Sequence, residues 1–271
     1  IQVPQTLEMH WRGRLPPGVC AKDMMLHTIA RMGMNGARYQ AVEFTGEAVR
    51  ALSMQERMTL SNMSAELGAQ SGLVAADEVT LHYLRGLGVG EATLDDALQW
   101  HTDPDAKTEL HEFNASDLSP QVAAPHSPAN TRPVADYAEI KPNVAYIGAC
   151  TGAKLEDLRA AAMVLKGRRV ASGTRLLVAP ASLADQMQAQ SEGVMQTLTD
   201  AGAEVLSTTC GACAGYGGTF EENAVVISST ARNFKARMGP ASVQVYLGSP
   251  YTVAASAVSG RITDPREMLT L

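Results

Sequence analysis

Strand-like and helix-like segments alternate from residue 143 to residue 259, and this alternation constrains the fold more than any other feature. Short apolar runs with the composition of buried strands occur at 143–149, 175–180, 204–207, 224–228 and 242–247. Apolar residues at helical spacing occupy 155–165, 181–189, 194–201 and 250–259. The alternation predicts an α/β fold in which a parallel or mixed sheet carries helices on both faces.

The first part of the chain also predicts an α/β domain, but one that is richer in helix. Strand patterns cover 6–13 and 41–45, and helix patterns cover 21–32, 54–69, 77–84 and 93–100. Ser53 followed by Glu56 has the spacing of a capping box at the start of the second helix. Closely spaced prolines then interrupt the chain between residues 114 and 136. We therefore predict two domains, 1–118 and 139–271, joined by a linker at 119–138.

Charge and composition exclude several classes of protein. A formal net charge of −6 argues against a nucleic-acid or anionic-membrane surface. No apolar run is long enough to span a bilayer, and no secretory leader is recognisable, so we expect a cytoplasmic protein. Ile1-Gln2-Val3-Pro4 is typical of the middle of a chain, and we expect the sequence to be part of a longer one.

Three of the four cysteines fall where predicted strands end. Cys150 follows the strand at 143–149, while Cys210 and Cys213 form a CxxC pair after the strand at 204–207. The carboxyl ends of parallel strands meet at one edge of a sheet, so we expect the three thiols to gather there. Three thiolates on a cube of iron and sulfide would leave one iron open as a Lewis acid, whereas an electron carrier normally uses four.

Other interpretations of these cysteines stay open. They are also compatible with buried apolar thiols or with a redox pair. Zinc would need a fourth ligand; no histidine lies near in sequence, and Cys20 falls in the other predicted domain.

Four ordered motifs resemble the aconitase superfamily. They are the segments 62–69 (NMSAELGA), 146–152 (YIGACTG), 210–213 (CGAC) and 232–237 (RNFKAR). The chain is most similar to large subunits of the group that contains 3-isopropylmalate dehydratase, homoaconitase and dimethylmalate dehydratase. The resemblance covers essentially the whole sequence.

The resemblance implies a cofactor, a reaction and a set of site residues. It implies a [4Fe-4S] cluster held by Cys150, Cys210 and Cys213, and an iron–sulfur hydro-lyase that reversibly dehydrates a hydroxy di- or tricarboxylate such as isopropylmalate, homocitrate or an alkylmalate. It places Asn62 and Glu66 near cluster and substrate. It also assigns Arg232 and Arg237 to the substrate carboxylates, which suits the planar guanidinium fork.

This sequence departs from the family pattern at several positions. Ala149, Gly152, Lys154 and Ala231 replace the usual Ser, Asn, Arg and Asn, which removes polar contacts near cluster or substrate. Nothing in the chain matches the preceding domain that carries acid–base residues in this family. The small swivelling domain, a separate subunit in split enzymes, is also missing. We expect the chain to need both for catalysis, and a binding or assembly module remains the alternative function.

Overall fold

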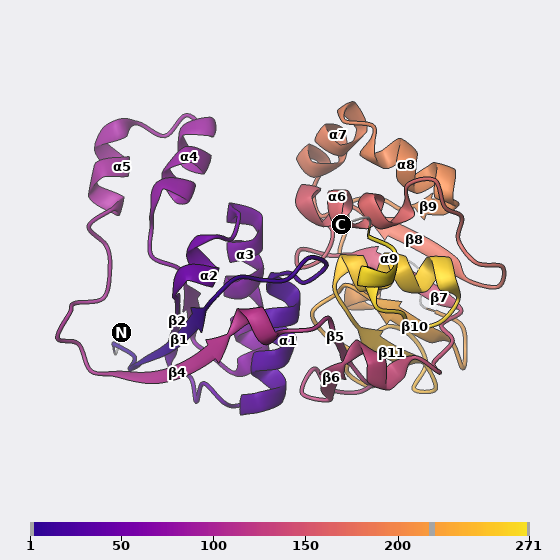
Figure 1. Cartoon of the computed structure of the whole chain (residues 1–271), viewed down its shortest axis with the longest axis horizontal. Helices are drawn as coiled ribbons and strands as arrows, with labels where there is room; N and C mark the ends of the chain where they lie inside the picture. The colour runs from indigo at the N-terminus through magenta and orange to yellow at the C-terminus, as the bar shows by residue number, and fades with distance from the viewer. Residues whose placement is uncertain (1–2, 217–219, 270–271) are drawn as a thin grey trace.

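The computed structural model describes residues 3–216 and 220–269 as two lobes side by side, each built on a sheet (Figure 1). The first lobe has a four-stranded sheet in the order β3-β2-β1-β4, and all its strand pairs are parallel. Its strands are β1 (Thr6–Arg12), β2 (Ala41–Thr45), β3 (Ser71–Leu73) and β4 (Thr108–Asn114). The strands β1 and β2 confirm the sequence prediction, whereas β3 and β4 were not predicted.

The helices of the first lobe are α1 (Ala21–Met32), α2 (Glu47–Arg50), α3 (Met54–Met63), α4 (Glu78–Gly86) and α5 (Glu91–Ala97). Three of them, α1, α3 and α4, begin where the sequence predicted, α5 begins two residues before its predicted start, and α2 was not predicted. Ser53 and Glu56 form the expected capping box at the start of α3. The predicted helix 54–69 is α-helical only to Met63. It continues as a short 3-10 helix, η1 (Ser64–Leu67), and ends at Gly68 with φ of 78°.

The second lobe is the mixed α/β structure that the alternation predicted. Its seven-stranded sheet has the order β6-β5-β11-β10-β7-β8-β9. The strands are β5 (Gln121–Ala123), β6 (Thr131–Pro133), β7 (Val144–Gly148), β8 (Arg175–Ala179), β9 (Ala203–Val205), β10 (Val225–Ser228) and β11 (Gln244–Leu247). The helices are α6 (Leu155–Leu165), α7 (Leu183–Ser191), α8 (Val194–Ala201) and α9 (Pro250–Ser259).

The segment 119–138, predicted as a linker, contributes structure to the second sheet. Its strands β5 and β6 pair antiparallel with each other, and β5 pairs antiparallel with β11. Prolines and short strand length hid this pairing in the sequence. The domain boundaries themselves stay a prediction.

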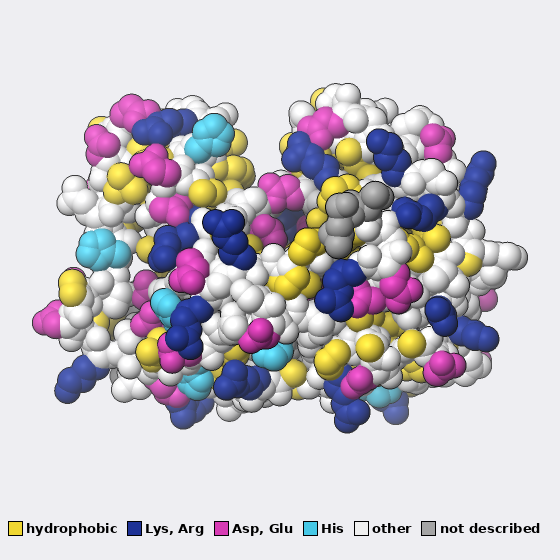
Figure 2. All heavy atoms as spheres, in the orientation of Figure 1, with side chains coloured by type: hydrophobic (Ala, Val, Ile, Leu, Met, Phe, Trp, Pro, Cys, Tyr) yellow, Lys and Arg dark blue, Asp and Glu magenta, His cyan; other side chains and the backbone are white. Residues whose placement is uncertain are grey.

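The strands of the second sheet send alternate side chains to two differently covered faces. Ala145, Ile147 and Val178 pack with residues of α6, α8 and α9. Tyr146, Leu177 and other residues of the opposite face belong to the same buried cluster as α1 and α3 of the first lobe. The lobes therefore share apolar core as well as polar contacts, and Figure 2 shows the notch between them on one margin.

Within the described residues, every helix is too short or too polar to cross a lipid bilayer.

Candidate functional site

The site lies where the carboxyl ends of three parallel strands face the first lobe. Cys150 follows β7, and the segment from Ser229 to Arg237 follows β10, the neighbour of β7. Cys210 and Cys213 follow β9; Cys210 precedes the short 3-10 helix η4 (Gly211–Ala214) and Cys213 lies within it. The strands β7, β8, β9 and β10 run parallel, so these loops leave the same edge of the sheet.

The loop that carries Cys150 is fixed tightly against the loop after β10. Ala149 has φ of 67°, a left-handed conformation that is costly for a residue with a Cβ atom. The Ser229 hydroxyl accepts from the Gly148 amide at 3.0 Å and donates to the Gly152 carbonyl at 2.9 Å. A Cβ atom on Gly152 would lie 2.3 Å from the Ser229 carbonyl oxygen, so any side chain there would collide. The Asn that the family resemblance leads one to expect at this position is excluded by Ser229.

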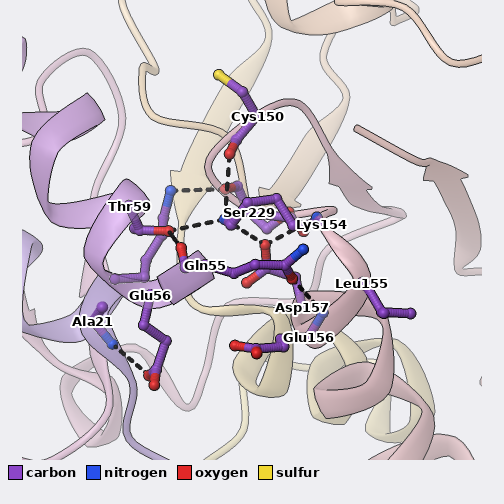
Figure 3. A network of polar contacts seen from close by, with 12 residues as sticks. Ala21, Gln55, Glu56, Thr59, Cys150, Lys154, Leu155, Glu156, Asp157 and Ser229 are labelled. Carbon is purple, nitrogen blue, oxygen red and sulfur yellow. Dashed lines mark hydrogen bonds and ion pairs between the residues drawn. The ribbon is translucent and has the colours of Figure 1, made fainter. Parts of the chain in front are cut away.

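Lys154 ties the Cys150 loop to the first lobe (Figure 3). Its ammonium donates to Thr59 Oγ1 of α3 at 2.9 Å, to Asp157 Oδ2 at 2.7 Å and to the Cys150 carbonyl at 3.2 Å. The Cys150 sulfur points away from this network (Figure 3). The contact with Lys154 thus holds the backbone of Cys150 in place, and the thiol points to the opposite side.

Lys22 of α1 makes a second bridge between the lobes. It is 1% exposed, and its ammonium donates to the carbonyls of Ser229 and Thr230, the two residues that follow β10. Burial lowers the pKa of Lys22 to about 8, although the charges of Glu66 and Asp157 oppose this shift. The bridge holds the start of the loop that leads to Arg232.

Two polar side chains at the end of α3 reach the second lobe. Asn62 Nδ2 lies 3.2 Å from Cys150 Sγ, in hydrogen-bonding contact. Glu66, in η1, is 2% exposed and forms an ion pair with the Nε of Arg232. The structure thus brings together Asn62 with Cys150 and Glu66 with Arg232, pairs that are far apart in sequence.

The charged groups and thiols influence one another across the site. The hydrogen bond to Glu66 raises the pKa of Arg232, and the thiols of Cys213 and Cys150 add to this rise. Burial raises the pKa of Cys213, and the guanidinium of Arg237 opposes part of the increase. Both arginines therefore lie within electrostatic range of the cysteines.

Buried polar atoms without a hydrogen-bond partner gather at this site. Among the described residues, such atoms include Tyr146 Oη, Thr151 Oγ1, Glu66 Oε2 and Arg237 Nε. Burial raises the pKa of Tyr146 to about 12, with further contributions from Cys213 and Cys210. Each buried polar atom without a partner lowers the stability of the folded state by about 1–3 kcal/mol. A group of such atoms in one place therefore indicates a binding site for a ligand.

The thiols of this site are of the ligand type that holds an iron–sulfur cluster. In the described part of the chain, no three His, Cys, Asp or Glu side chains converge closely enough to hold one ion. Cysteine ligands of an iron–sulfur cube bind different irons at its corners and need not converge on a point. Free thiols at three positions, together with polar atoms that lack partners, fit such a group.

Three contributors to the site were missed from the sequence. Lys22 resembles an ordinary solvated residue in the first turn of a helix, and no local signal marks its burial. Tyr146 and Thr151 lie inside a recognised motif, but only their unpartnered hydroxyls distinguish them from core residues. A buried tyrosine in a strand that leads directly to a cysteine loop was the one available hint.

The chain belongs to the Aconitase family (aconitate hydratase), whose model matches residues 1–144 and 132–260. Among similar proteins, the 3-isopropylmalate dehydratase large subunit of Moorella thermoacetica is 43% identical over 99% of this chain. Large subunit 1 of 3-isopropylmalate dehydratase from Pyrococcus furiosus is 41% identical over 99% of this chain. The chain spans 63% of the length of each of these two relatives.

One solved structure resembles the fold more distantly. The holo-form of aconitase X from Thermococcus kodakaraensis matches with a TM-score of 0.45 and 13% sequence identity, over 85% of this chain and 50% of that one.

Proposed function

We propose that this chain is the cluster-holding part of an iron–sulfur hydro-lyase that reversibly dehydrates a hydroxy di- or tricarboxylate. Cys150, Cys210 and Cys213 would hold a [4Fe-4S] cluster. The observation that carries this proposal is the set of unpartnered buried polar atoms beside these three thiols. When bound, such a cluster supplies one iron without a protein ligand, which acts as a Lewis acid on a substrate hydroxyl.

The arginines of the loop after β10 are suited to hold substrate carboxylates. The Nε of Arg232 is occupied by Glu66, which leaves its two terminal nitrogens for a carboxylate and fixes the plane of the guanidinium. Arg237 has a buried Nε that no described residue accepts from, and it can donate there. A substrate with two or more carboxylates would therefore be bound from this loop while its hydroxyl faces the cysteines.

Asn62 and Glu66 orient the site from the first lobe. The Asn62 amide contacts the Cys150 sulfur and would keep that thiolate turned outward. Glu66 has one oxygen on Arg232 and a second buried oxygen that is free to accept a hydrogen bond from substrate. Their role in this proposal is to bind and orient; the acid–base groups that move the proton would come from elsewhere in the assembled enzyme.

We further propose that the active enzyme includes a small subunit. The relatives are named as large subunits, and this chain covers 63% of their length. A swivel-domain partner and the remaining portion of a large subunit would complete the site. The unpaired thiols suit the reducing cytoplasm.

Anaerobic reconstitution with iron and sulfide tests the proposal directly. We expect the wild-type chain to take up iron and acid-labile sulfide in equal amounts, and Cys150→Ser, Cys210→Ser and Cys213→Ser to lose most of this uptake. Cys20→Ala is the matched control, because Cys20 is the remaining free cysteine and lies at the start of α1. Equal uptake by Cys150→Ser and wild type would exclude the proposed ligand set.

The same preparation separates the alternative functions. One zinc per chain and no iron would identify a zinc or redox protein. Reconstituted chain that forms a stable complex with a small subunit, yet shows no hydratase activity on malate derivatives once the missing portion is supplied, would identify a binding module.

A further inference from the structure

Tyr146 has a buried hydroxyl that finds no hydrogen-bond partner among residues 3–216 and 220–269. The side chain is 0% exposed, and its oxygen makes no hydrogen bond to any residue that the structure describes. Leaving this hydroxyl unpaired costs free energy that a phenylalanine would avoid, since the ring alone fills the same space. The hydroxyl is the part of Tyr146 that needs an explanation.

The hydroxyl is directed at the segment that joins Cys210 to Cys213. An ideal Cβ atom on Gly211, the residue between them, would lie 3.4 Å from Tyr146 Oη. Both thiols also lie near enough for their charges to act on the phenol. In the described part of the chain no acceptor, the sulfur atoms of Cys210 and Cys213 included, forms a hydrogen bond with this oxygen.

The backbone around Tyr146 is shaped to admit its ring. A Cβ atom on Gly148 would lie 2.4 Å from the ring carbon Cε1 and 2.7 Å from the hydroxyl oxygen, so only glycine fits there. The ring of Phe220 packs edge-on, with centroids 6.0 Å apart. Because glycine and an aromatic neighbour fix the ring, the hydroxyl cannot turn away toward solvent.

We propose that Tyr146 is a positioning residue that donates its hydroxyl hydrogen to sulfur, either a thiolate of the Cys210–Cys213 pair or a sulfide of the cluster that these cysteines hold. The contact fixes η4 and withdraws charge from the sulfur. This inference rests on the proposed cluster. Hydrogen bonds from such outer groups hold metal ligands in place, and their loss typically weakens metal retention by about tenfold or more.

The test compares Tyr146→Phe with wild type, first without and then with the cluster. Tyr246→Phe is the matched control, because Tyr246 is a partly buried tyrosine of β11 whose ring contacts Tyr137. In the cluster-free chain, we expect Tyr146→Phe to match or exceed wild type in stability to urea. In the reconstituted chain, we expect a chelator to remove iron about tenfold faster from Tyr146→Phe, which corresponds to about 1.4 kcal/mol.

The iron–sulfur vibrational bands provide a second measurement. They would not differ between the two proteins if Tyr146 had only a structural role. We expect these bands to shift when wild type is transferred to D₂O and to shift less in Tyr146→Phe. Unchanged iron loss and unchanged bands, with normal cluster uptake by both proteins, would overturn the role of Tyr146 alone. A loss of stability in the cluster-free variant would also overturn it, because the hydroxyl would then have a partner within the chain. Failure of wild type to take up a cluster would overturn the proposed function and this inference together.

Discussion

Two regions between the lobes differ in how well their polar groups are satisfied. The first, which we call the seam, comprises Lys22, Asp23, Thr59 and Lys154 with their partners. Both buried ammonium groups there have acceptors across the lobe boundary. The second, which we call the open face, comprises Tyr146, Thr151, Glu66 and Arg237, each with a buried polar atom that has no hydrogen-bond partner in the described part of the chain. Among the described residues, no seam side chain has such an atom.

The difference separates structural polar groups from groups held ready for a ligand. A buried network that is fully satisfied fixes the two lobes in one arrangement. Buried atoms without partners lower stability and are kept where they contribute to binding. Substitutions in the seam should therefore destabilise the cluster-free chain, whereas removal of polar atoms from the open face should not.

Lys22→Met is expected to have the largest effect. The variant leaves the Ser229 and Thr230 carbonyls without their buried donor, and we expect the free energy of unfolding to fall by about 3 kcal/mol. Urea denaturation of the cluster-free chain measures this loss. Lys166→Met, at an exposed lysine just after α6, is the control and should change stability little. A small loss in Lys22→Met would mean that the seam does not hold the lobes.

Asp23 should make the stability of the seam depend on pH. Its Oδ1 accepts a hydrogen bond from the backbone N–H of Gln121 at 2.8 Å. Burial raises the pKa of Asp23 from 3.8 to about 6. Between these values the folded chain holds a proton that the unfolded chain has lost, so lowering the pH through this window favours the folded state. From pH 7 to pH 4.5 this contribution amounts to about 2 kcal/mol.

The contribution of Asp23 is the free energy of unfolding of wild type minus that of Asp23→Asn, measured at each pH. We expect the difference in unfolding free energy to move in favour of wild type as the pH falls from 7 to 4.5. A difference that stays constant across this range would show that Asp23 does not titrate in the window.

Thr59→Val should weaken the seam by a smaller amount. The Thr59 hydroxyl accepts from Lys154 Nζ across the lobes and donates to the Gln55 carbonyl within α3. Lys154 keeps two other acceptors, so we expect a loss of about 1 kcal/mol in urea denaturation. Thr197→Val provides the comparison, because the Thr197 hydroxyl donates to a carbonyl four residues back and makes no contact across the lobes. Equal losses of stability in the two variants would mean that the hydrogen bond between Thr59 and Lys154 contributes nothing to stability.

Local signals were enough to predict most of the second lobe and several helix starts of the first lobe. Helix starts such as Ser53 with Glu56, and apolar runs such as 144–148, depend on residues that are close in sequence. The strand β4 was missed because only Phe113 of its residues is buried, so the alternation of a half-buried strand is absent. The strands β5 and β6 are three residues each and owe their existence to pairing with β11 and with each other.

Candidate site residues could be chosen from the sequence where the residue type itself indicates the chemistry. Residues that matter because they are buried could not be recognised in this way. Thiols and arginines in the motifs were enough to propose Cys150, Cys213 and Arg232 as site residues, and their roles stay predictions. The burial of Lys22 depends on a loop more than two hundred residues away, at Ser229. From the sequence, Gly152 was interpreted as the loss of a polar contact. In the structure, its lack of a side chain leaves room for Ser229.

Thr151→Val should have the smallest effect on the cluster-free chain, and one of opposite sign to the seam variants. Thr151 is 1% exposed and its hydroxyl has no partner within residues 3–216 and 220–269, so an isosteric valine removes an unpaired polar atom at little steric cost. We expect the free energy of unfolding to rise by roughly 0.5 kcal/mol in urea. Once the cluster is bound, the sign should reverse, because wild type then gains the hydrogen bond that valine cannot make. Destabilisation of the cluster-free chain by Thr151→Val would place this residue in the seam and remove the distinction between the two regions.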